Sequence, residues 1–104
     1  MKVYLLVFYV PEDYSEKVKK AVFTAGAGSL GNYDSCCWQT VGDGQFRPVS
    51  GSSPFIGLQG EVEHVREVRV EMICRNEKID SVLEALHQAH PYETPACVWW
   101  EVNA

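Results

Sequence analysis

The order in which hydrophobic patterns follow one another constrains the fold of this chain more than any other feature. Residues 2–10 form an almost unbroken β-branched and aromatic run, which is typical of a strand covered on both faces. In residues 12–25 the apolar side chains instead recur on one stripe of a helix, and glycines follow. Residues 33–41 predict a second strand.

The second half of the chain repeats this succession. A long connection rich in glycine, proline and serine is predicted at residues 42–65. Residues 67–74 then alternate between apolar and charged side chains, as a half-buried strand does. Asn76 is predicted to cap a second helix, and residues 96–102 form the closing strand. The inner stripe of this helix consists of Ile79, Val82, Leu83, Leu86 and His90.

This β-α-β-β-α-β order predicts an α+β fold, the ferredoxin-like sandwich, in one domain over residues 1–104. Its antiparallel sheet would carry both helices on one face. Because the two halves run antiparallel, the connections at residues 11–13, 42–65 and 90–95 are expected at the same end of the sheet. Any site built from loops belongs at that end.

The other face of the sheet has no cover within the chain, although its first and last strands are apolar on both faces. Trp99 and Trp100 are neighbours in the last strand, so their side chains point to opposite faces. A bare apolar sheet face indicates an interface. We therefore expect a homo-oligomer whose subunits cover one another's sheets.

The composition of the chain limits which classes of binding partner and which cellular location we expect. The net charge of −5 argues against nucleic acid and against an anionic membrane surface. No apolar run reaches the roughly 20 residues of a spanning helix, and the apolar start of the chain is interpreted as a strand, not a signal peptide. The cysteines form no C-x-x-C pair and are interpreted as small buried residues, which favours the cytoplasm. They are Cys36, Cys37, Cys74 and Cys97.

Residues 90–95, with the sequence His-Pro-Tyr-Glu-Thr-Pro, hold more polar functional groups than any other short connection of the chain. The two prolines exclude a helix there. The plainer interpretation of His90 is a bond to the last carbonyls of the helix; the alternative is a ligand or proton-sensing group beside Tyr92 and Glu93. His90 and Glu93 are also the weak candidates for a metal ion. His64 and His87 are predicted to be exposed, so no zinc-type ligand set forms.

Residues 44–48, with the sequence Gly-Gln-Phe-Arg-Pro, are the second candidate segment. Arg47 could grip a carboxylate or phosphate, with Phe46 stacked on a ring and Gln45 nearby. Alternatively, Phe46 packs under the loop and Arg47 pairs with an acid of a neighbouring subunit. The segment lacks the phosphate-loop motif, and no catalytic residues are assigned. The predicted ligand-binding residues are Gln45, Phe46, Arg47, His90, Tyr92 and Glu93.

Two resemblances rest on these motifs. Residues 67–74 and the 90–95 motif resemble CutA, a trimeric protein linked to divalent-cation tolerance, with the PII/CutA architecture. Over the whole chain, the sequence resembles the CutA/PII-like domain inserted in Nif-three-like proteins. The residues that carry this second resemblance are 26–28, 31–36, 42–48, 54–57 and 90–95.

The resemblance implies a trimer and a stand-alone copy of the accessory domain. The dinuclear metal site of Nif-three-like proteins lies in flanking domains, so none of its ligands transfers to this sequence. Thr94 stands where that family more often has an acidic residue. We expect a non-enzymatic, oligomeric PII/CutA-like binding or regulatory module for a small anionic ligand or a metal ion. The alternatives are a CutA-like divalent-metal-binding protein and an accessory subunit or remnant of a Nif-three-like metal-dependent hydrolase. A divalent metal ion is the one candidate cofactor. A protein partner is also possible as an alternative to a small ligand.

Overall fold

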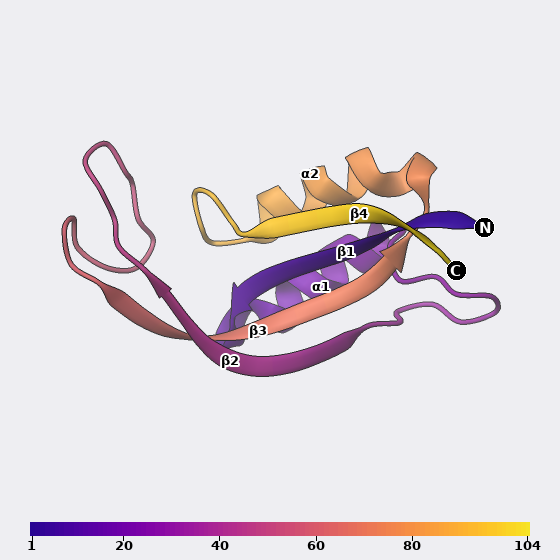
Figure 1. Cartoon of the computed structure of the whole chain (residues 1–104), viewed down its shortest axis with the longest axis horizontal. Coiled ribbons are helices and arrows are strands. Elements are labelled where there is room, and N and C mark those ends of the chain that lie inside the picture. The colour runs from indigo at the N-terminus through magenta and orange to yellow at the C-terminus, as the bar shows by residue number, and fades with distance from the viewer.

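The computed structural model describes residues 1–104 and contains one antiparallel sheet of four strands in the order β2-β3-β1-β4. Helices α1 (Ser15–Thr24) and α2 (Ile79–Ala89) lie together on one face of this sheet (Figure 1). Every strand pairing is antiparallel, so the predicted ferredoxin-like α+β fold is confirmed. The strands are β1 (Lys2–Pro11), β2 (Trp38–Phe46), β3 (Glu63–Cys74) and β4 (Cys97–Asn103).

The hydrophobic core lies between the sheet and the helices. Leu6, Phe8 and Val10 of β1 alternate with residues that point to the opposite face, as the period of a strand requires. The alternation predicted for residues 67–74 is confirmed, because Val68, Val70, Met72 and Cys74 are all buried in this core. Phe8 is fully buried, and such burial stabilises the fold by about 1.5–3 kcal/mol.

The second strand lies further along the chain than predicted. It begins at Trp38, and it continues through Gly42 and Gly44 to Phe46. Before it, Ser35 adopts a φ of 56° and the backbone N–H of Cys36 donates to the Gly28 carbonyl at 2.8 Å, so this segment is a turn. The connection between β2 and β3 therefore covers residues 47–62, not 42–65. Glycines that indicate a loop in the sequence here belong to a ladder with β3.

The start of the second helix also differs from the prediction. Asn76 begins a short 3-10 turn, Asn76–Lys78, and no side chain caps it. A matching turn, Glu12–Tyr14, precedes α1. Ser15 follows that turn, and its hydroxyl donates to the Glu12 carbonyl at 2.9 Å.

The elongated molecule measures 46 × 24 × 22 Å, and its two ends differ. The connections at residues 11–13, 47–62 and 90–96 gather at one end, which we call the loop end (Figure 1). The termini and the connection between α1 and β2 lie at the other end. The predicted meeting of three connections is confirmed.

The sheet face opposite the helices, which we call the open face, carries exposed apolar side chains. Trp100 pairs with Leu5 on this face, whereas Trp99 pairs with core residue Leu6, so the two tryptophans point to opposite faces as predicted. Trp38 and Val98 add to the open face and are 60% and 51% exposed.

No helix of the chain is long and apolar enough to cross a membrane.

Candidate functional site

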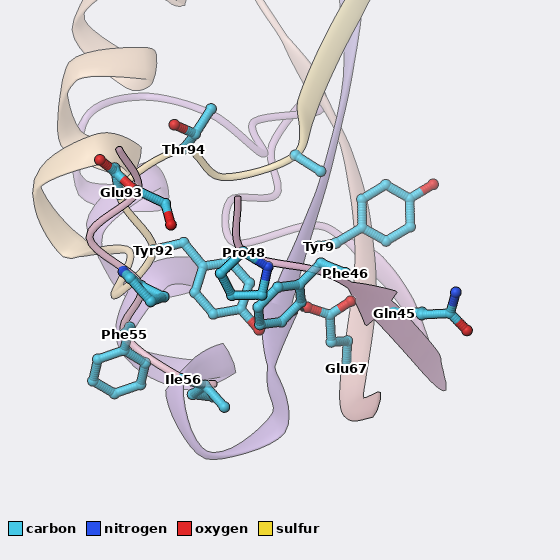
Figure 2. A pocket seen from close by; sticks show the side chains of 13 residues that line it. Tyr9, Gln45, Phe46, Pro48, Phe55, Ile56, Glu67, Tyr92, Glu93 and Thr94 are labelled. Atoms are coloured by element: carbon cyan, nitrogen blue, oxygen red, sulfur yellow. Dashed lines mark hydrogen bonds between the residues drawn. The ribbon is translucent and has the colours of Figure 1, made fainter. Parts of the chain in front are cut away.

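A cavity of about 270 Å³ lies at the loop end, between the 47–62 connection and the 90–96 turn (Figure 2). Strand register places Tyr9 and Glu67 on the open face, because their neighbours Val10 and Val68 belong to the core. The cavity therefore lies at the end of the sheet, on the side away from the helices. Its lining residues are Tyr9, Gln45, Phe46, Pro48, Ser52, Pro54, Phe55, Ile56, Glu67, Tyr92, Glu93, Thr94 and Ala96.

Aromatic contacts and hydrogen bonds hold the walls of the cavity in place. The rings of Phe46 and Tyr92 pack edge to face, with centroids 5.7 Å apart. Phe55 packs in the same way on Tyr14, at 5.4 Å, which ties the 47–62 connection to the 3-10 turn before α1. The backbone N–H of Ser53 donates to Glu93 Oε2 at 3.0 Å and joins the connection to the 90–96 turn. These contacts join the walls of the cavity to one another.

Glu67 and Tyr92 form the polar centre of the cavity. The Tyr92 hydroxyl donates to Glu67 Oε2 at 3.0 Å. Burial raises the pKa of Tyr92 well above its ordinary value, and the hydrogen bond and charge of Glu67 raise this pKa further. Tyr92 therefore stays protonated and acts as a donor.

Gly44 makes room for the Glu67 side chain. A Cβ atom at position 44 would lie 2.5 Å from Glu67 Cδ and 3.0 Å from Glu67 Cγ. The carboxylate therefore lies across the backbone of β2, where any side chain at position 44 would displace it. At Gly42, two residues earlier on the same face, a Cβ would meet nothing within 4 Å.

His90 is 6% exposed and connects the end of α2 to β1. Its Nε2 lies 2.7 Å from the Tyr9 carbonyl oxygen, and its Nδ1 accepts a 3.1 Å hydrogen bond from the Tyr92 backbone N–H. These partners require a neutral ring that carries its proton on Nε2. Burial lowers the pKa of His90, and the Tyr9 carbonyl only partly opposes this effect. The imidazole thus bonds to a strand carbonyl, not to a helix carbonyl, and positions Tyr92.

Four of the six predicted ligand residues line the cavity: Gln45, Phe46, Tyr92 and Glu93. Gln45 lies at its margin, and Figure 2 shows its side chain pointing away from the other labelled residues. His90 lies behind Tyr92, outside the lining. Arg47 is exposed and also lies outside the lining, although it follows Phe46 directly.

The charged side chains that line the cavity are acidic. Its charged lining residues are Glu67 and Glu93, and no arginine or lysine is among them. The cation expected to hold an anionic ligand, Arg47, is therefore not in position to do so within this cavity.

Sequence reasoning missed Glu67, Phe55 and Tyr9. Each stands in a segment that the sequence predicts to be a strand or a loop, without a site residue. A signal for Glu67 was present, because strand alternation places this acid on the open face next to core residue Val68, close to the loop end. Phe55 stands in residues 54–57, one of the motifs of the whole-chain resemblance.

The weak metal candidates do not form a metal site within one chain. Both ring nitrogens of His90 have partners, and Glu93 Oε2 accepts a bond from Ser53. No group of three or more His, Cys, Asp or Glu side chains is placed to hold a metal ion.

Comparison with known proteins identifies the family. The family described as CutA1 divalent ion tolerance protein matches residues 52–104, half of the chain. The chain belongs to the CutA1 family. A structure of the CutA protein from Archaeoglobus fulgidus covers 100% of this chain and 86% of its own length, with a TM-score of 0.67 and 17% identity, which shows the shared fold.

Relatives of the Nif-three-like type match more closely in sequence. A Mycobacterium tuberculosis protein named GTP cyclohydrolase 1 type 2 homolog is 50% identical over 90 residues, which are 86% of this chain and 24% of that protein. A Bacillus cereus protein related to NIF3 has a TM-score of 0.85 and 35% identity, over 99% of this chain and 26% of that one. This CutA1-family chain thus spans about a quarter of the length of the curated relatives it matches. Both resemblances inferred from the sequence are confirmed.

Proposed function

We propose that this CutA1-family chain is a non-catalytic, oligomeric binding or regulatory domain that holds a small molecule in the loop-end cavity. The observation that carries the proposal is the cavity itself, an aromatic-walled space with a few convergent polar groups. Such spaces are the usual binding sites of small molecules. Its walls come from the connections that meet at the loop end, so ligand binding would change how these connections are held.

The chemistry of the lining supports binding rather than catalysis. Tyr92 is held protonated and donates to Glu67, and both nitrogens of the nearby His90 have backbone partners. Tyr92 and His90 are thus held by hydrogen bonds to other groups of the chain. Their bonds position Tyr92 in the wall of the cavity.

We also propose that the chain forms a homo-oligomer, with a trimer favoured by the CutA resemblance. The exposed apolar side chains of the open face support this, since neighbouring copies would cover Trp38, Val98 and Trp100. Light scattering at micromolar concentration tests the proposal, and a monodisperse monomer would contradict it. The free cysteines fit the cytoplasmic location expected from the sequence.

A second candidate function is an accessory role in or beside a Nif-three-like protein. The 35% identity to the Bacillus cereus protein over nearly the whole chain favours it. Titration of the purified chain with a full-length Nif-three-like protein in a calorimeter would detect such a partnership. A divalent-ion role, which the family description suggests, would need ligands from more than one subunit.

A thermal-shift screen tests the main proposal. A small-molecule library is screened on the wild type, on Phe46→Ala, which removes part of the aromatic wall, and on His64→Ala. His64 is an exposed β3 residue outside the lining and serves as the control. A ligand of the cavity should raise the melting temperature of the wild type and of His64→Ala but not of Phe46→Ala. Hits that act equally on all three variants would contradict the proposal.

A further inference from the structure

We propose that the loop-end cavity selects a small organic cation of the amidinium or guanidinium class, with Glu67 as the recognition residue. This inference rests on the proposed binding function and gives it a ligand chemistry. It replaces the anionic ligand that the sequence led us to expect.

The side chains that line the cavity are unbalanced in charge. Two carboxylates line the cavity, Glu67 and Glu93, and no cation does. An anion that entered would meet both carboxylates, whereas a cation would be attracted by both. The lining therefore favours a positive guest.

The two arginines of β3 near the cavity, Arg66 and Arg69, do not neutralise these acids. Arg66 Nε pairs with Glu12 at 2.8 Å. Arg69 Nε pairs with Glu71 at 3.3 Å, and its Nη1 donates to the Tyr9 hydroxyl at 3.0 Å. Each guanidinium is thus held by other groups, and neither belongs to the lining of the cavity.

The Glu67 carboxylate is held in a fixed place in the cavity. Its Oε2 accepts the Tyr92 hydroxyl, which fixes the orientation of the group. Its Oε1 lies against the backbone of Gly44, in the space that a side chain at this position would fill. A carboxylate can accept several hydrogen bonds, so acceptor capacity is left after Tyr92 has bound. Planar groups with two parallel N–H donors, such as amidinium and guanidinium, match a carboxylate in this way.

The cavity also has an aromatic wall. Phe46, Tyr92 and Phe55 line the same cavity as Glu67, and Tyr9 completes it (Figure 2). Aromatic faces attract planar cations, and this attraction grows where water is excluded. A volume of about 270 Å³ suits a guest built on a single ring. Glu93 lies beside the wall as a second attracting charge, on the turn that borders the cavity.

Three probes that share one ring and differ in charge test this inference: benzamidine, benzamide and benzoate. Their affinities are measured by calorimetry on the wild-type chain and on Glu67→Gln, which keeps the shape of residue 67 and removes its charge. We expect benzamidine to bind best and benzoate not to bind. Glu67→Gln should weaken benzamidine by about tenfold or more, because a hydrogen bond to a charged acceptor is lost. Equal affinities for the three probes, or an unchanged benzamidine affinity in Glu67→Gln, would overturn the inference.

A second variant protects the test against misfolding. Glu93 is exposed and a glutamine can still accept the Ser53 N–H, so Glu93→Gln should fold as the wild type does. It should weaken benzamidine by about threefold through the lost charge. Should benzamide or benzoate bind best and lose affinity in Phe46→Ala, the cavity is a binding site but the inferred ligand class is wrong. Failure of all three probes to bind would count against both the inference and the proposed function.

Discussion

Replacing Gly44 with alanine should destabilise the chain, whereas the same replacement at Gly42 should not. The two glycines lie on the same face of β2, two residues apart, and neither has a positive φ. A Cβ at position 44 would lie 2.5 Å from Glu67 Cδ, so the carboxylate must move away from the Tyr92 hydroxyl. A Cβ at position 42 meets no atom within 4 Å. The pair thus isolates the contact with Glu67 from the general effect of alanine in a strand.

The magnitude follows from the bond that is lost. A hydrogen bond to a charged acceptor contributes about 1.5–3 kcal/mol net. An alanine that fits without strain stabilises by about 0.4–1 kcal/mol through the unfolded chain. Gly44→Ala should therefore lower the free energy of unfolding by about 1–2 kcal/mol, while Gly42→Ala raises it slightly. The gap between the two variants should be about 2 kcal/mol.

Urea unfolding, followed by tryptophan fluorescence at one fixed protein concentration, measures this gap. The fixed concentration matters because association would add to the apparent stability. Calorimetry with benzamidine on both variants adds a functional readout, since only Gly44→Ala should lose affinity. If the two variants unfold at the same urea concentration, the position assigned to the Glu67 side chain is wrong.

Three further predictions concern single side chains. Tyr92→Phe keeps the ring on Phe46 but loses the bond to Glu67, so urea unfolding should show a loss of about 1–2 kcal/mol; no loss would mean that this bond does not form. Burial lowers the pKa of His90, so the unfolded chain binds its proton more tightly than the folded chain does; the stability of the wild type should fall as the pH drops below about 6.5, and that part of the fall should be absent in His90→Gln. A fall of the same size in both proteins would contradict the role of His90. Burial raises the pKa of the Cys97 thiol to about 11, so iodoacetamide should label exposed Cys37 much faster than Cys97, as mass spectrometry of the peptides would show. Equal labelling rates in the folded protein would refute this.

The element order of the fold could be predicted because each element shows one clear hydrophobic period. Core residues such as Leu6, Phe8 and Val70 fall where that period places them. The bounds of β2 could not be predicted, because Gly42 and Gly44 resemble loop residues. A glycine is needed at position 44 because the Glu67 side chain packs against it. This contact between two strands cannot be predicted from the local sequence.

The candidate site could be predicted only in part, because its residues come from segments that are distant in the sequence. Tyr92 and Glu93 could be found because the 90–95 turn concentrates polar groups between two prolines. Glu67 and Phe55 are distant from this turn in sequence, and only the folded chain brings them beside it. The sequence indicates Arg47 as a cation able to grip an anion, but the direction of a loop side chain depends on tertiary packing. The sign of the charge in the cavity therefore needed the structure.

The central claim is that the loop-end cavity is the binding site of this CutA1-family domain. Its most direct test is an NMR titration, in which benzamidine is added to the isotope-labelled protein and the backbone amide chemical shifts are measured. We predict saturable shift changes that concentrate on the lining residues, above all Phe46, Ser52, Glu67 and Tyr92. The turn at Ser35, at the other end of the molecule, should not respond. Changes centred on that turn or on the open face around Trp100, with the loop end unaffected, would contradict it.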